Sequence, residues 1–123
     1  MSSLIHRVSE LLAGIGVEHR LYGDKLLVEG WEEGQRFGIV VEVEPPLIKA
    51  IGLTDARPSC DDALRLLASN FEAKGWRFAL DPDGYLAVVV EEPLEKLSPQ
   101  TLRDMLERVR SGISKILSLG GAR

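Results

Sequence analysis

The sequence is poor in the residues that form covalent cross-links and metal centres. Its 123 residues include one cysteine, Cys60, and two histidines, His6 and His19. One cysteine allows no intramolecular disulfide, which fits a reducing cytoplasm. No His-x-x-x-His or His-Cys spacing occurs, so we expect no zinc site. We expect one domain, residues 1–123, because a chain of this length can bury enough apolar surface without such cross-links.

Long apolar runs and an excess of positive charge are also missing. The purely apolar runs are only a few residues long, far short of the roughly 20 that a membrane helix needs. The formal net charge is −4, so no overall field attracts nucleic acid or an anionic membrane. We therefore expect neither as a partner. The basic residues near the C-terminus alternate with acids, as on a solvated helix face: Arg108, Arg110, Lys115 and Arg123 with Asp104 and Glu107.

Three helical patterns and several extended runs alternate along the chain. Apolar residues recur at helical spacing from Leu4 to Ile15, from Ser59 to Gly75, and from Ser98 to Gly120-Gly121. Short extended runs, VEHRLY, KLLVEGW, QRFGIVVEVE and LIKAIGL, separate the first two patterns, and WRFAL and YLAVVV follow the second. We count the first group as about three strands. The order α-β-β-β-α-β-β-α predicts an α+β fold, a two-layer α/β sandwich with an antiparallel sheet.

The stretch LDPDGYLAVVV (80–90) could be a calcium loop or a β-hairpin. A calcium loop needs oxygen ligands at alternate positions and a glutamate at the twelfth. If Asp83 and Gly84 take the fifth and sixth places, the first is Ala79 and the twelfth is Val90. Neither side chain can bind calcium. A glycine that accepts positive φ between two apolar runs favours the hairpin.

Two features at the start of the second helix could carry chemistry. The helix dipole can lower the pKa of a thiol at Cys60, but no second cysteine or histidine is near it in sequence. Asp61 and Asp62 could act as acid and base, yet acids in a first turn already stabilise a helix. We assign no catalytic residue, no metal ligand and no cofactor.

The second helix is apolar over a wider arc than the other two, roughly 200° at about 100° per residue. One fully buried leucine contributes about 1.5–3 kcal/mol, so Leu66 in water would forfeit a useful amount. Single exposed leucines are common, but this arc favours a partner on its flank. The main face of this helix consists of Leu64, Leu67, Ala68 and Phe71. Its second flank consists of Ala63, Leu66 and Asn70.

The order of elements, above all FEAKGWRFALDPDGYLAVVVEEPLEKLSPQTLRDML (71–106), resembles the type III secretion chaperone-like fold family. It is more similar to the YbjN-like, non-secretion branch than to effector chaperones. The resemblance implies an α/β sandwich, non-enzymatic protein binding, and homodimers formed through the second helix and the adjoining strand. The candidate dimer or partner-binding residues are then Ala63, Leu66, Leu67, Asn70, Phe71 and Trp76.

Two functional hypotheses follow. The first is a cytoplasmic, homodimeric protein-binding or chaperone-like module without catalysis, which binds itself and another polypeptide. The alternative is a small-ligand-binding protein or enzyme with a pocket between sheet and helices. Trp31, Phe37 and Trp76 could line such a pocket, although each residue is of a type that is more often core.

Overall fold

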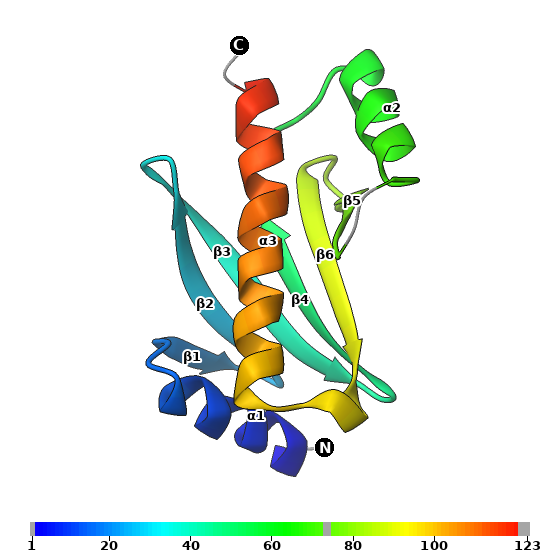
Figure 1. Ribbon diagram of the computed structural model, residues 1–123. Helices are drawn as coiled ribbons and strands as arrows, with labels where there is room; N and C mark the ends of the chain where they lie inside the picture. The colour runs from blue at the N-terminus through cyan, green and yellow to red at the C-terminus, as the bar shows by residue number, and fades with distance from the viewer. Residues whose placement is uncertain (1, 73–74, 121–123) are drawn as a thin grey trace.

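A computed structural model describes residues 2–72 and 75–120 of the chain. It is an α+β fold with three helices and one six-stranded antiparallel sheet, as the sequence predicts (Figure 1). In chain order the elements are α1 (Ser2–Gly14), β1 (His19–Tyr22), β2 (Lys25–Glu32), β3 (Gln35–Glu44), β4 (Leu47–Leu53), α2 (Cys60–Ser69), β5 (Arg77–Leu80), β6 (Leu86–Pro93), the 3-10 turn η1 (Leu94–Lys96) and α3 (Pro99–Gly120).

The predicted count of three strands before the second helix was one short. Tyr22 pairs with Lys25 at a tight turn in which Gly23 has a φ of +64°. That turn separates β1 from β2, so the run VEHRLY contributes a strand of its own at the edge of the sheet.

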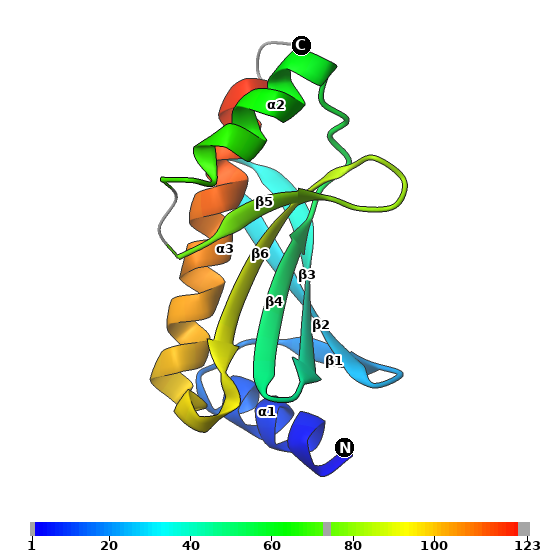
Figure 2. The same ribbon diagram turned by 90° about the vertical axis from the view of Figure 1, so that its right-hand side faces the viewer.

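The strands lie in the order β1-β2-β3-β4-β6-β5, and every neighbouring pair is antiparallel. β4 and β6 are neighbours in the sheet although α2 and β5 come between them in the chain. α3 covers one face of the sheet, α1 packs at its lower end, and no helix of the described residues covers the opposite face (Figures 1 and 2). The helices therefore form one layer and the sheet the other.

The core lies between α3 and alternate residues of the central strands. Side chains of one parity point toward the helices, as the two-residue period of QRFGIVVEVE predicts. The deeply buried side chains of this layer include Ile39, Val41, Ile48, Val88, Val90, Leu102, Met105, Val109, Ile113 and Ile116.

Two glycines allow α3 to approach the sheet closely. A Cβ on Gly52 of β4 would lie 2.6 Å from Val109 Cγ1 of the helix. A Cβ on Gly112 of the helix would lie 2.6 Å from Val88 Cγ1 of β6. Because Gly52 and Val88 are paired in register, both contacts belong to one crossing point. A methyl group on either side would push the two layers apart.

The helix starts follow the sequence signals, whereas the end of the second helix does not. The backbone N–H of Asp62 donates to Ser59 Oγ at 3.1 Å, and that of Thr101 donates to Ser98 Oγ at 3.0 Å. α2 ends at Ser69, not at Gly75, and passes into a tighter turn that ends at Glu72. The predicted end of the last helix at Gly121 lies outside the described residues.

The stretch 80–90 is a hairpin, and its first aspartate shapes the bend. The backbone N–H groups of Asp83 and Tyr85 both donate to Asp81 Oδ1 at 2.9 Å. Gly84 has a φ of +87°. The Asp81 carboxylate is therefore used in the turn itself, as in an Asx-turn.

Candidate interaction surface

α2 lies beside the C-terminal half of α3 and above β5, at one end of the molecule (Figures 1 and 2). One α2 side chain, Leu66, is buried, at 6% exposure, and it joins the main core cluster. Ala63 and Asn70, which share its side of the helix, are half-buried. The helix is thus held to the body along the narrow face Ala63–Leu66–Asn70.

Asn70 fixes the end of α2 to the edge strand β5. Its Nδ2 donates to the carbonyl oxygen of Phe78 at 3.0 Å, and its Oδ1 accepts from the N–H of Phe78 at 2.7 Å. The side-chain amide thereby satisfies both polar groups of one edge-strand residue. A polar side chain on the inward face of α2 is stabilised by these two bonds, because an unpaired amide there would be costly.

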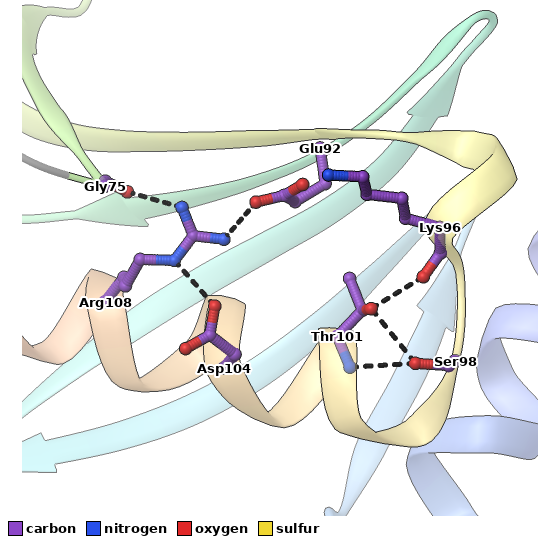
Figure 3. Close-up of polar contacts among 7 residues, drawn as sticks. All are labelled: Gly75, Glu92, Lys96, Ser98, Thr101, Asp104 and Arg108. Atoms are coloured by element: carbon purple, nitrogen blue, oxygen red, sulfur yellow. Dashed lines mark hydrogen bonds and ion pairs between the residues drawn. The ribbon is translucent and has the colours of Figure 1, made fainter.

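Arg108 of α3 holds the segment that returns from α2 to the sheet (Figure 3). Its guanidinium donates to the carbonyl oxygen of Gly75 at 3.0 Å and to Glu92 Oε2 of β6. Arg108 Nε lies 3.0 Å from Asp104 Oδ2, outside hydrogen-bond geometry, so this contact is an ion pair only. One half-buried arginine thus connects three elements behind α2.

The opposite side of α2 carries three large apolar side chains in solvent. Leu64 is 67% exposed, Leu67 46% and Phe71 95%, and Ala68 between them is exposed as well. These four residues, Leu64, Leu67, Ala68 and Phe71, are called the outer face of α2 below. Leu64, Leu67 and Ala68 recur at i, i+3 and i+4 on α2, and Phe71, at i+7, follows in the turn just past its end.

The prediction from apolar spacing assigned the two faces of α2 in the wrong order. It placed Leu66 on a flank that only a partner would cover, whereas Leu66 is buried by its own chain. The main face, with Leu67 and Phe71, points outward instead. The physical reason is Asn70: its amide pairs with the edge of β5, so the face that contains Asn70 turns inward although it is the less apolar one.

Five of the six candidate residues therefore fall into two groups, and Trp76 stands apart. Leu67 and Phe71 lie together on the outer face, and Ala63, Leu66 and Asn70 face the body. Trp76, just before β5, is half-buried, and a Cβ on Gly112 would lie 3.1 Å from its Cδ1. Leu64 and Ala68 were missed as candidates, although their spacing with Leu67 placed them on the same stripe.

The three aromatic residues of the alternative pocket do not meet. Trp31 is 56% exposed, with the Arg36 guanidinium 5.5 Å from its ring centroid. Phe37 is buried, and its ring covers Gly30, where a Cβ would lie 2.5 Å from Phe37 Cζ. Phe37 also borders an open groove of about 1040 Å³ between the end of α1 and β1–β3, but neither Trp31 nor Trp76 does.

The remaining polar candidates have structural partners or stand alone. His19 Nε2 lies 2.6 Å from Ser9 Oγ and its Nδ1 lies 2.9 Å from the carbonyl oxygen of Val17, so His19 connects β1 to α1. Cys60 is exposed and unbonded. Within residues 2–72 and 75–120, no three His, Cys, Asp or Glu side chains group so that they could hold a metal ion. No helix in this part of the chain is long and apolar enough to span a membrane.

Comparison with known proteins places the fold. No protein-family model and no curated protein sequence matches the chain. Among solved structures, YbjN from E. coli matches with a TM-score of 0.72 at 14% identity, over 94% of this chain and 93% of that one. This chain has the type III secretion chaperone-like fold.

Two further solved structures extend this fold likeness to secretion chaperones. The complex of ExoU and SpcU from the type III secretion system of Pseudomonas aeruginosa matches with a TM-score of 0.65 at 19% identity, over 91% of this chain and 96% of that one. The Yersinia pestis type III secretion chaperone SycH, in complex with a fragment of YscM2, matches with a TM-score of 0.61 at 18% identity, over 96% and 98%. Both structures hold the related fold in complex with another polypeptide.

Proposed function

We propose that this protein is a non-enzymatic, homodimeric protein-binding module of the chaperone-like kind, and that the outer face of α2 is its dimer surface. The observation that carries this proposal is the exposure of Leu64 and Leu67 on one short helix and of Phe71 in the turn just past its end. Exposed single leucines are ordinary, but a contiguous apolar stripe on a small domain is typical of an interaction site.

A second copy of the chain is the partner that best fits this stripe. A two-fold dimer places the same surface on both sides, so an apolar stripe meets an apolar stripe. Leu67 and Phe71 keep the role that the family resemblance gave them, and Leu64 and Ala68 join them. Ala63, Leu66 and Asn70 face the body rather than the partner, and Trp76 is half-buried beside Gly112 of α3.

Binding of a further polypeptide completes the proposal. It is supported by the solved structures of SpcU with ExoU and of SycH with a YscM2 fragment, which share the fold. Of the three aromatic residues of the alternative ligand pocket, Phe37 borders the groove at the end of α1, whereas Trp31 and Trp76 do not. As part of the same proposal we place the module in the cytoplasm, which its single cysteine fits.

The test is the molecular mass in solution of the wild type and of Leu67→Glu, measured by analytical ultracentrifugation over a concentration series. We expect a dimer for the wild type and a monomer for Leu67→Glu, because a carboxylate on the outer face would have to be desolvated in the interface. Leu21→Glu is the matched control: Leu21 is 53% exposed against 46% for Leu67, and β1 and α2 lie at opposite ends of the molecule (Figure 1). A monomeric wild type, or equal loss of dimer in both variants, would contradict the proposal.

A further inference from the structure

We infer that the second copy packs its α2 antiparallel to the first, with Arg65 of each copy facing Glu72 of the other. This inference rests on the proposed dimer and specifies the orientation of its two helices. Two observations support it: charged residues lie along one border of the outer face, and the side of α2 at the other border packs against the body of the molecule.

Among the described residues, the outer face has one charged border. Asp61 and Arg65 lie four residues apart on one side of α2, Glu72 follows in the tighter turn just past its end, and all three are exposed. Arg65 and Glu72 make no ion pair within residues 2–72 and 75–120. The other border is the uncharged face Ala63–Leu66–Asn70, which is turned toward the body of the molecule.

Symmetry decides which borders meet. When two identical helices pack antiparallel about a two-fold axis, each border meets its own copy, as the e–e and g–g positions of antiparallel coiled coils do. In a parallel pair, each border meets the opposite one. Only antiparallel packing brings the charged border of one copy to the charged border of the other. Parallel packing would place the charged border of one copy against the face Ala63–Leu66–Asn70 of the other copy, which already contacts the body.

The register that centres the apolar stripe also pairs the charges. With the two-fold axis near Leu67 and Ala68, Leu64 of one copy lies opposite Phe71 of the other. Arg65 is then about two residues, or roughly 3–5 Å along the axis, from the position opposite Glu72, which lies in the turn just past the end of α2. An arginine side chain easily reaches that far. Asp61 lies about as close to Glu72 of the other copy, on the opposite side of the position that faces it. Without Arg65, the charged border would therefore contain only acidic residues.

Cys60 provides a direct measure of the orientation, because it is the only cysteine, is exposed and stands at the start of α2. In the antiparallel register, the two Cys60 positions are 15 residues apart along the axis, which with an interaxial distance of about 9 Å gives roughly 24 Å. In a parallel pair they would be only about 10 Å apart. Nitroxide labels on Cys60 and pulsed electron spin resonance separate these two distances.

The charge pair is tested by exchange. We expect Arg65→Glu to weaken the dimer about tenfold or more at low salt, and Arg65→Glu with Glu72→Arg to restore most of the affinity. Arg103→Glu, an exposed arginine of α3, is the control for net charge. A wild-type dimer with the short label distance, or with equal effects of Arg65→Glu and Arg103→Glu, would overturn the antiparallel pairing while leaving the proposed dimer intact. A monomeric wild type would instead reject the proposed function.

Discussion

Replacing Leu66 with alanine removes three carbon atoms from the one α2 side chain that is buried in the core. At about 0.8 kcal/mol for each buried carbon group, the transfer term alone is about 2.4 kcal/mol. The space left behind adds a cavity term, which in well-packed cores raises the total toward 5 kcal/mol. Because α2 lies at one end of the fold, its neighbours can relax into part of that space. We expect a loss of about 3 kcal/mol in the free energy of unfolding.

The matched control is Leu64→Ala, the same substitution two residues earlier on the exposed side of the helix. We expect this control to change the unfolding free energy by less than about 0.5 kcal/mol, as surface substitutions do. Urea unfolding at several protein concentrations separates folding from association, and amide hydrogen exchange of α2 reports its local opening. Equal losses for the two variants, or faster exchange in Leu64→Ala than in Leu66→Ala, would refute the assignment of the two faces.

Two further predictions concern the contacts that position α2 and α3. Gly52→Ala should destabilise the protein by about 1–3 kcal/mol in urea unfolding, because its Cβ would meet Val109 at 2.6 Å. The control Gly38→Ala, with nothing within 4 Å of the added Cβ, should be near neutral. A larger loss in Gly38→Ala than in Gly52→Ala would refute the close approach of helix and sheet. Asn70→Ala should cost about 1–3 kcal/mol and speed amide exchange at Phe78, because two hydrogen bonds to that edge residue are lost. Unchanged exchange at Phe78 would show that Asn70 does not hold the edge strand.

The features that the sequence predicted correctly are set by local interactions. Ser59 and Ser98 cap their helices because a hydroxyl accepts from an amide three residues ahead, and this requires no distant partner. The hairpin at Gly84 depends on one φ value. The two-residue period of β3 predicts that one side of the strand is buried, whichever element covers it. These signals were enough for the α+β class and for the positions of the three helices.

The features that sequence reasoning missed depend on partners that are distant or polar. The separate strand β1 exists because of its pairing with β2, and a four-residue run carries too little periodicity to predict it. The orientation of α2 depends on Asn70 and Phe78, eight residues apart. Apolar counting placed the richer face of α2 inward, because it gave Asn70 no value as a hydrogen-bonding side chain. A lone asparagine on the poorer face, followed by an edge strand, is the signal that could have corrected it.

The amount of apolar surface on α2 explains why the charged border matters for association. Leu64, Leu67 and Phe71 together expose the equivalent of about two full side chains per copy. At about 1.5–3 kcal/mol for each, burial in a dimer contributes roughly 6–12 kcal/mol. Association itself costs an estimated 4–15 kcal/mol in lost freedom of motion. The two terms nearly cancel, so the outer face alone gives a weak dimer. In the proposed dimer, contacts at its border, Arg65 with Glu72 first among them, then determine how tightly the two copies bind.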